Sequence, residues 1–258
     1  MIVKKSPDEI EQMAAAGKIH ARCLNMLAGK ARAGVSTLDL DAAAARFLRS
    51  QGADASFLGY RGFPGSICAS PNSMIVHGIP GPEPLERGDL LSIDLGVTLD
   101  GWVVDGAVTV AVGPATAIAD KLLSATRDAL TDAVEQCRVG NHLGDIGHAV
   151  QSRVEKQGLA VVKALVGHGV GRSMHEDPQI ANYGDPGTGV ELAEGMVLAI
   201  EPMITTGSDD VRMGDDGWAV FTVDGSLAAH FEHTVAITAE GPRILTPWHL
   251  EDSERRAA

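Results

Sequence analysis

The chain has 258 residues, a formal net charge of −13, 45% hydrophobic and 21% charged residues, and three cysteines. This length supports a sizeable buried core in one large domain, and the composition excludes a disordered chain. The sequence pI of about 5.0 argues against an extended nucleic-acid or anionic-membrane surface, because phosphate binding requires clustered Lys and Arg. We therefore expect no nucleic-acid partner and no membrane partner.

The N-terminus and the cysteines predict a cytoplasmic protein. Residues 1–13 are charged and lack the apolar core of a secretory signal, and no run of about 18 apolar residues could span a bilayer. Cys23, Cys68 and Cys137 are odd in number and widely spaced, which fits a reducing compartment better than a disulfide framework. We expect a monomer with a disordered tail over 251–258, where the residues are charged and small.

Helical patterns precede strand patterns twice along the chain. A helix opens at Pro7, followed by acidic residues that suit its first turn, and a second follows Ser36 or Thr37. Glycine and proline interrupt residues 57–84, which predicts loops joined by short strands. Later segments are predicted as helices over 116–137 and 143–157, and as short strands between glycine-rich turns over 161–245.

The chain also repeats itself weakly. At an offset of 106 residues, six residues recur with the same or a similar type: Gly34, Asp39, Leu40, Ala43, Gln51 and Gly52 recur as Gly140, Asp145, Ile146, Ala149, Gln157 and Gly158. Asp94 and Glu201 occupy matching places in a second block of the repeat. We interpret this as a duplicated α+β fold in one domain over 1–250, with pseudo-repeats at about 10–115 and 116–245.

Residues 91–110 predict a β-hairpin that carries two carboxylates. Apolar residues alternate with small or polar ones from Leu91 to Leu99, and Asp100-Gly101 is a strong two-residue turn. A tight turn places Asp94 diagonally from Asp105 on one sheet face, and two carboxylates there repel unless a cation lies between them. From the hairpin alone, an exposed face with both carboxylates solvated is an equal alternative.

Three more ligand-type residues favour the metal interpretation. His168 lies in a glycine-rich segment predicted to be a loop open to a ligand. Glu201 ends an apolar strand that Pro202 stops, and Glu232 lies among strand-forming residues. With Asp94 and Asp105 they make an oxygen-rich set with one imidazole, which suits two divalent ions about 3.5–4 Å apart.

At this point the chain resembles a known family, the type I methionine aminopeptidases of the pita-bread fold. The resemblance covers nearly the whole chain, from the first helix to about Trp248, and depends on six motifs in order. These are Ser73-Met74-Ile75-Val76-His77-Gly78-Ile79-Pro80, the Asp94/Asp105 pair, Gly167-His168-Gly169-Val170-Gly171, His175-Glu176-Asp177-Pro178-Gln179, Ile200-Glu201-Pro202-Met203 and Glu232-His233-Thr234. It implies two pseudo-symmetric halves with antiparallel sheet and outer helices.

The resemblance also implies the roles of the five ligand candidates. Asp94 would chelate one metal, Asp105 and Glu232 would bridge both, and His168 and Glu201 would complete the second metal's shell. A hydroxide between the metals would attack the first peptide bond of a nascent polypeptide and release an N-terminal methionine that precedes a small residue. Glu201 would also pass a proton to the leaving amine.

Two histidines and an apolar pocket complete the implied site. His77 and His175 resemble the family's histidines that bind the scissile amide and assist catalysis. The implied methionine pocket consists of Tyr60, Phe63, Cys68, Met174 and Trp218, in which a thioether packs well against aromatic rings and sulfur. Phe57 and Met174 stand where other members often carry cysteine and phenylalanine, so the shape of this pocket differs from theirs.

The implied cofactors are two divalent ions, for which Co²⁺, Mn²⁺, Fe²⁺ and Zn²⁺ all suit the ligand types. Some members also hold a monovalent cation with backbone carbonyls near Asn72 and Met74. The substrates would be nascent polypeptide N-termini, with the ribosome surface as a docking partner.

Three alternatives stay open, one of which, a metal-storage or regulatory protein, would leave His77, His175 and the apolar pocket without a role. An X-Pro peptidase shares the fold and the metal set, but such enzymes carry an N-terminal domain, and the first helix here begins by about residue 8. A non-catalytic pita-bread protein could bind protein or nucleic acid. Such relatives have lost metal ligands and gained basic tails, whereas this chain keeps all five ligand positions and carries a net charge of −13.

Overall fold

Four α-helices begin at capped positions in the computed structural model, which describes residues 1–249. They are α1 (Pro7–Lys30), α2 (Thr37–Ser50), α3 (Ala117–Glu135) and α4 (Leu143–Glu155), and a short 3-10 helix, η1, spans Tyr60–Gly62. Ser6 and Ser36 accept hydrogen bonds from the third residue of α1 and α2, and both pairs form capping boxes. The predicted helix positions are confirmed, and the starts agree to within one residue. The predicted tail over 251–258 lies outside the described residues.

The strands are short, and every pairing between them is antiparallel. The first half contains β1 (Asp54–Ala55), β2 (Cys68–Pro71), β3 (Met74–Val76), β4 (Leu90–Asp94), β5 (Val97–Leu99), β6 (Trp102–Val104) and β7 (Ala107–Ala111). The second half contains β8 (Ala160–Val161), β9 (Val166–Gly169), β10 (Glu176–Ala181), β11 (Val197–Ile200), β12 (Met203–Thr205), β13 (Val211–Met213), β14 (Val220–Thr222), β15 (Ala228–His230), β16 (His233–Thr238) and β17 (Gly241–Ile244).

These strands form one five-stranded sheet and four three-stranded sheets within residues 1–249. The largest has the order β10-β9-β11-β16-β17, and the others are β2-β4-β7, β15-β12-β8, β13-β14-β3 and β1-β5-β6. Two helices followed by strands occur twice along the chain, as predicted, and the mixed α+β class is confirmed. The internal duplication and the single domain over 1–250 stay predictions.

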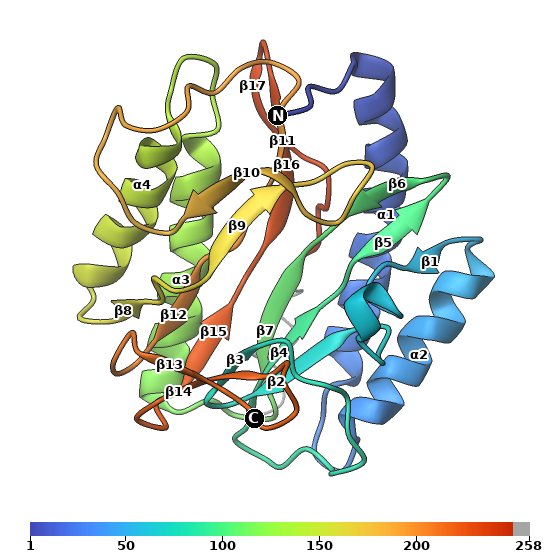
Figure 1. Cartoon of the computed structure of the whole chain (residues 1–258). Helices are drawn as coiled ribbons and strands as arrows, with labels where there is room; N and C mark the ends of the chain where they lie inside the picture. Colours follow the sequence, from blue (N-terminus) through green and yellow to red (C-terminus); the bar gives the residue numbers. More distant parts are fainter. Residues whose placement is uncertain (250–258) are drawn as a thin grey trace.

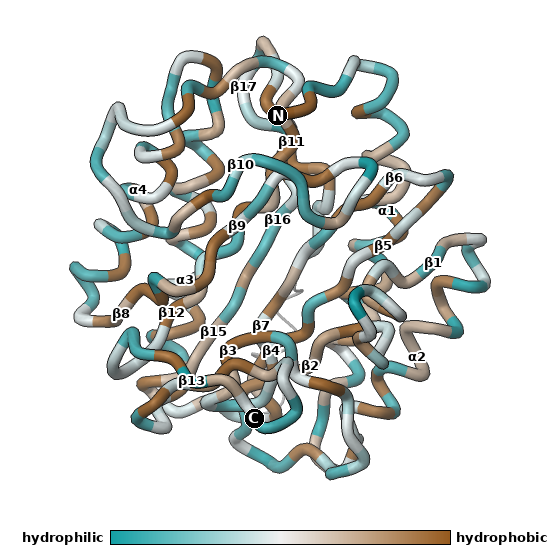
Figure 2. The backbone as a smooth tube through the Cα atoms, viewed as in Figure 1, coloured by the Kyte–Doolittle hydropathy of each residue, from teal (hydrophilic) through white to brown (hydrophobic). Residues whose placement is uncertain are grey.

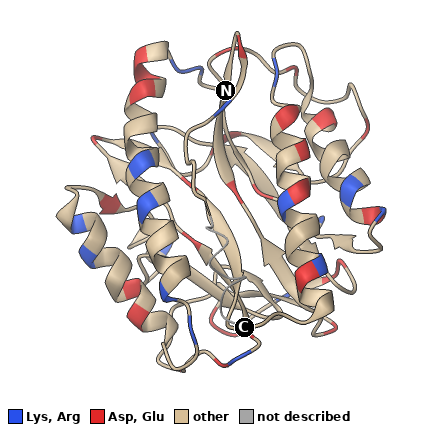
Figure 3. Ribbon diagram, turned by 180° about the vertical axis from the view of Figure 1, so that it is seen from behind, with Lys and Arg blue, Asp and Glu red and all other residues tan. Residues whose placement is uncertain are grey.

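All four helices cover the same face of the sheets, as two separate pairs. In the view of Figure 1, α1 and α2 lie at one edge of the molecule and α3 and α4 at the other edge. Seen from behind, all four helices lie in front of the strands and carry charged residues of both signs (Figure 3). The opposite side of the sheets is therefore left to strand ends and loops.

The core forms where the helices pack on the sheets. Helix α1 buries Ile10, Met13, Leu24 and Leu27, which recur at helical spacing. Figure 2 shows apolar and polar residues alternating along the helices, as expected when only one face meets the core. All three cysteines are buried and free, so the expectation of no disulfide framework is confirmed. No helix within residues 1–249 is long and apolar enough to cross a membrane.

The predicted hairpin is correct at its turn but not along its length. Leu99 pairs with Trp102, and Asp100 and Gly101 both have positive φ angles, 51° and 76°, as a type I′ turn requires. The predicted continuous strand over 91–99 is wrong, because the chain bends after Asp94 and places β4 and β5 in different sheets. A methyl group on Gly96 would lie 2.3 Å from Met174 Cε, so glycine allows this close approach.

Candidate metal centre and active site

The five ligand candidates meet in one cavity of about 170 Å³. They come from strands and from the residues next to strand ends: Asp94 ends β4, Asp105 follows β6, His168 lies in β9, Glu201 follows β11, and Glu232 lies between β15 and β16. Asp94 and Asp105 are only 8% and 4% exposed. The alternative of an exposed face with solvated carboxylates is therefore wrong.

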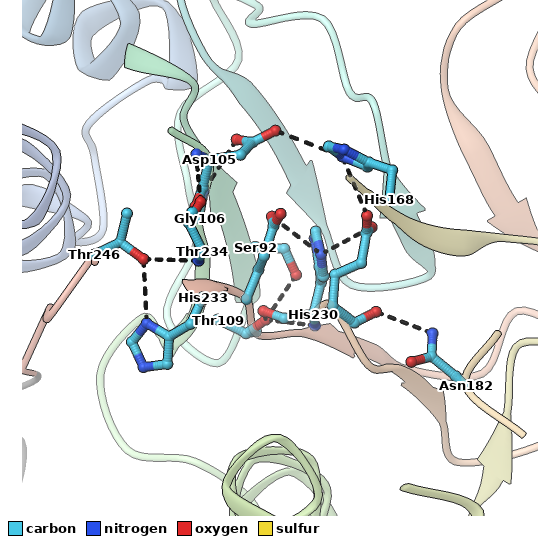
Figure 4. Close-up of polar contacts among 12 residues, drawn as sticks. Ser92, Asp105, Gly106, Thr109, His168, Asn182, His230, His233, Thr234 and Thr246 are labelled. Atoms are coloured by element: carbon cyan, nitrogen blue, oxygen red, sulfur yellow. Dashed lines mark hydrogen bonds and ion pairs between the residues drawn. The ribbon is translucent and has the colours of Figure 1, made fainter. Parts of the chain in front are cut away.

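The candidate ligand atoms are close enough to share an ion. Nε2 of His168 lies 3.5 Å from Glu201 Oε1 and 4.0 Å from Asp105 Oδ2, and Figure 4 shows Asp105 and His168 facing one another. One ligand atom from each of Asp105, His168 and Glu232 lies within 4.8 Å of the other two. Ligands on one ion with bonds near 2.1 Å are about 3–4 Å apart, which these separations match.

Burial and mutual repulsion make the carboxylates suited to a cation. Desolvation is the largest cause that raises the pKa of each of the four carboxyls, and the charge of Asp105 raises the pKa of Asp94, Glu201 and Glu232 further. Oδ1 of Asp94 and Oε1 of Glu232 are buried without a hydrogen-bond partner among residues 1–249. Buried acceptors without donors fit a divalent cation, so the residues present suit the implied metal.

His168 is held in the orientation of a metal ligand. Its Nδ1 lies 2.9 Å from the Gly169 carbonyl oxygen, so Nδ1–H donates there and the Nε2 lone pair faces the carboxylates. The expectation that His168 lies in a loop is wrong, because Gly167–Gly169 belong to β9. Glycine is required for packing here, since a methyl group on Gly169 would lie 2.1 Å from the Asp177 carbonyl oxygen.

Hydrogen bonds from distant segments fix the backbone of three ligand candidates. The Thr234 hydroxyl accepts from the Asp105 amide at 2.9 Å and donates to the Asp105 carbonyl at 2.8 Å. The other two bonds run from Asn182 Nδ2 to the Glu201 carbonyl at 3.0 Å and from Trp248 Nε1 to the Glu232 carbonyl at 2.8 Å. The site therefore depends on contacts across the whole sheet assembly.

The two predicted catalytic histidines also line the cavity. His77 has a φ of 61°, which is unusual for a non-glycine residue. The amide of the next residue, Gly78, donates to the Ser70 hydroxyl at 3.0 Å and so helps to fix the backbone here. The Tyr60 hydroxyl lies 2.8 Å from Nδ1 of His175. Burial is the main cause that lowers the pKa of His175 to about 4, so its ring is neutral at pH 7.

One wall of the cavity is aromatic. Phe63 packs edge-on against Trp218 at 5.1 Å and against Phe57 at 6.3 Å between ring centroids. Tyr60, Phe63, Cys68 and Trp218 line the cavity, as does Phe57. Met174 is not among the residues that line the cavity, and its Cε lies against Gly96.

Sequence reasoning missed two residues at the site. Arg61 lines the cavity, and His230 is 1% exposed with Nε2 3.6 Å from Glu201 and 3.8 Å from Glu232. The signal for His230 was its place two residues before Glu232, because a period of two puts side chains on one strand face. His233 instead stacks on Trp248 away from the carboxylates, as expected for the opposite face.

Comparisons with known proteins agree with this geometry. The model of metallopeptidase family M24 matches residues 11–239. A methionine aminopeptidase of Clostridium perfringens is 48% identical over 246 residues, covering 95% of this chain and 99% of that protein. The crystal structure of methionine aminopeptidase from Rickettsia prowazekii has a TM-score of 0.94 and 42% identity, covering 95% of this chain and 100% of that chain.

A more distant likeness extends to the peptidases that cleave next to proline. The Xaa-Pro dipeptidase from Bacillus anthracis matches with a TM-score of 0.76 and 22% identity, covering 96% of this chain and 63% of that chain. At this identity the likeness shows the shared fold alone. The expected pita-bread fold is confirmed, and the chain belongs to metallopeptidase family M24, on its methionine aminopeptidase branch.

Proposed function

We propose that this chain removes the N-terminal methionine of nascent polypeptides when the second residue is small. The observation that carries this function is that five metal-ligand side chains and an aromatic wall share one buried cavity. The methionine aminopeptidases that resemble the chain over nearly its whole length support the same substrate class.

Asp94, Asp105, His168, Glu201 and Glu232 would hold two divalent ions, with Mn²⁺, Fe²⁺, Co²⁺ and Zn²⁺ as candidates. When bound, such ions polarise a carbonyl oxygen and lower the pKa of water to near neutrality. The carboxylates supply the negative charge that binds the ions. His168 supplies the one nitrogen ligand, because its tautomer leaves the Nε2 lone pair free.

The other cavity residues bind the substrate and move protons. His175, with its Nδ1 beside the Tyr60 hydroxyl, would present Nε2–H as a donor to the scissile amide, and His77, which lines the same cavity, would bind the same group. Glu201 would also pass a proton to the leaving amine, as a carboxylate within the cavity can.

The methionine side chain would lie against Tyr60, Phe63, Cys68 and Trp218, where aromatic edges and sulfur suit a thioether. Met174, which is not among the lining residues, would act on the same pocket indirectly, through its contact with Gly96. Further parts of this proposal are a monovalent cation near Asn72 and Met74, docking on the ribosome surface, a monomeric state and a cytoplasmic location.

The test is methionine release from a Met-Ala-Ser peptide, with chelator and after adding back Mn²⁺, Fe²⁺ or Co²⁺. We expect release that chelator abolishes and that Glu201→Gln reduces about 10²–10⁴-fold, the usual effect of losing a general acid or base. The exposed Glu194→Gln is the matched control and should keep wild-type activity.

A Leu-Ala-Ser peptide and an Ala-Pro dipeptide are the substrate controls, and neither should be cleaved. Turnover of Ala-Pro in place of Met-Ala-Ser would identify an X-Pro peptidase. Tight metal binding without any turnover would instead support a non-catalytic binding protein.

A further inference from the structure

A second imidazole faces the carboxylate cluster. His230 ends β15, is 1% exposed, and directs Nε2 at Glu201 Oε2 (3.6 Å) and at Glu232 Oε2 (3.8 Å). These distances are about 0.7 Å longer than an N–H···O hydrogen bond. Neither ring nitrogen has a hydrogen-bond partner among residues 1–249. A buried imidazole without partners is costly, so its position between two carboxylates calls for a function.

The backbone of His230 is firmly held. The Thr109 hydroxyl accepts from the His230 amide and donates to the His230 carbonyl, both at 2.8 Å. Because the Thr109 proton is used in this way, the Ser92 hydroxyl, 2.8 Å away, donates to Thr109. Figure 4 shows these three residues together beside the cluster. The imidazole is therefore aimed at the carboxylates by a buried network that reaches β4 and β7.

The two imidazoles contact different oxygens of the Glu201 carboxylate: His168 faces Oε1 and His230 faces Oε2. Their second ring nitrogens differ. Nδ1 of His168 donates to the Gly169 carbonyl, which leaves Nε2 free as a lone pair. Within residues 1–249, Nδ1 of His230 has no acceptor, so a proton on Nδ1 would be buried and unpaired, whereas a proton on Nε2 faces two carboxylate oxygens.

We propose that His230 is a positioning residue that directs Nε2–H at the Glu201 and Glu232 carboxylates, and that it is not itself a metal ligand. The inference rests on the proposed function, in which these two carboxylates bind metal. The single Nε2–H, placed against Oε2 of both glutamates, restrains the two carboxylates by charge–dipole attraction and leaves Oε1 of each for the ion. Loss of such an outer partner typically lowers metal affinity about 10–100-fold.

The test compares His230→Gln, which keeps an N–H donor, with His230→Leu, which removes it. Titration calorimetry of the metal-free full chain with Mn²⁺ measures affinity directly. We expect His230→Leu to weaken Mn²⁺ binding about 10–100-fold and His230→Gln to remain within about threefold of wild type. The matched control is His148→Gln, which changes an exposed imidazole on α4 and should leave affinity unchanged.

The visible absorption of the Co²⁺-loaded protein separates a positioning residue from a ligand. We expect the band positions of His230→Gln to match wild type, because the set of metal ligands is unchanged. A shifted spectrum together with weak binding in both variants would identify His230 as a ligand and overturn the proposal. Wild-type affinity in His230→Leu would overturn it as well, provided that thermal unfolding shows all variants folded.

A failure of the proposed function gives a different result. If the wild-type chain binds no Mn²⁺, or if Glu201→Gln binds it as tightly as wild type, the carboxylate centre itself is refuted. If wild type binds and Glu201→Gln does not, the centre stands and the His230 variants alone decide the inference.

Discussion

The Tyr60 hydroxyl lies 2.8 Å from Nδ1 of His175, and the two rings stack with centroids 5.4 Å apart. These residues are 115 positions apart in the chain and come from opposite halves. If the phenol donates to Nδ1 of the neutral imidazole, the ring carries its proton on Nε2. The proposed function requires this tautomer, because Nε2–H then serves the substrate.

Replacing Tyr60 with Phe should therefore lower kcat/KM about five- to tenfold, the effect of losing a hydrogen bond of about 1 kcal/mol. The ring stacking stays, so the protein should unfold at the wild-type temperature. Tyr183→Phe, at the chain's other tyrosine, which is 40% exposed, is the control. Activity is measured as methionine release, and an equal loss in Tyr60→Phe and Tyr183→Phe would refute the role of the Tyr60 hydroxyl.

The glycine at position 169 should not tolerate alanine. A methyl group there would lie 2.1 Å from the Asp177 carbonyl oxygen, so β9 and β10 would separate and His168 would move. We expect Gly169→Ala to lower the free energy of unfolding by more than about 2 kcal/mol, as overpacking against backbone does. Metal affinity, measured by calorimetry, should fall with it.

Gly29→Ala provides the opposite control. Gly29 lies in α1 with nothing within 4 Å of an added methyl group. Alanine should stabilise this helix by about 0.5–1 kcal/mol. Denaturant unfolding of both variants gives the comparison, and equal stability of Gly169→Ala and wild type would contradict the packing argument.

Removing one buried carboxylate should stabilise the metal-free protein while weakening metal binding. Burial, and next the charge of Asp105, raise the pKa of Asp94 well above its usual range. A raised pKa means that the favourable contribution of Asp94 to stability is present at low pH and lost as pH rises through that value. In chelator at pH 7.5, Asp94→Asn should unfold about 2–4 °C above wild type, the shift that 1 kcal/mol gives in a domain of this size.

The decisive measurement is how the difference in unfolding temperature between Asp94→Asn and wild type changes with pH. The gap between Asp94→Asn and wild type should widen from pH 5.5 to pH 8, because only wild type carries the group that must ionise. The exposed Asp215→Asn should show no such gap. A gap that narrows with rising pH would show that the Asp94 carboxylate is stabilised, not destabilised, in the folded protein.

The Thr234 hydroxyl should matter for both stability and metal binding. It makes two buried hydrogen bonds to the backbone of Asp105, 129 residues away. Thr234→Val leaves that amide and carbonyl unpaired, so we expect a loss of about 1–3 kcal/mol in the free energy of unfolding. Thr131→Val, which removes an exposed hydroxyl on α3, should cost little, and similar losses in both variants would count against a special role for Thr234.

Some features follow from local sequence and were predictable. Pro7 and the serine caps at Ser6 and Ser36 determine where the helices begin, because capping acts over three or four residues. The Asp100-Gly101 turn is equally local, since glycine and aspartate tolerate positive φ angles. The ligand candidates were also found in the sequence. Carboxylates among apolar strand residues can be recognised from the local sequence alone, without knowing which strands pair.

Other features were decided only by the tertiary structure. The break after Asp94 depends on which strands β4 and β5 pair with, and no residue near the break encodes those distant partners. Met174 is not among the residues that line the cavity, and it packs on Gly96 from the other half of the chain. His230 faces Glu201 because β15 pairs with β12, which begins two residues after Glu201, and Met203 is the partner of His230 in that pairing. Local rules determined the elements and the chemical types, whereas long-range packing determined which side chains meet.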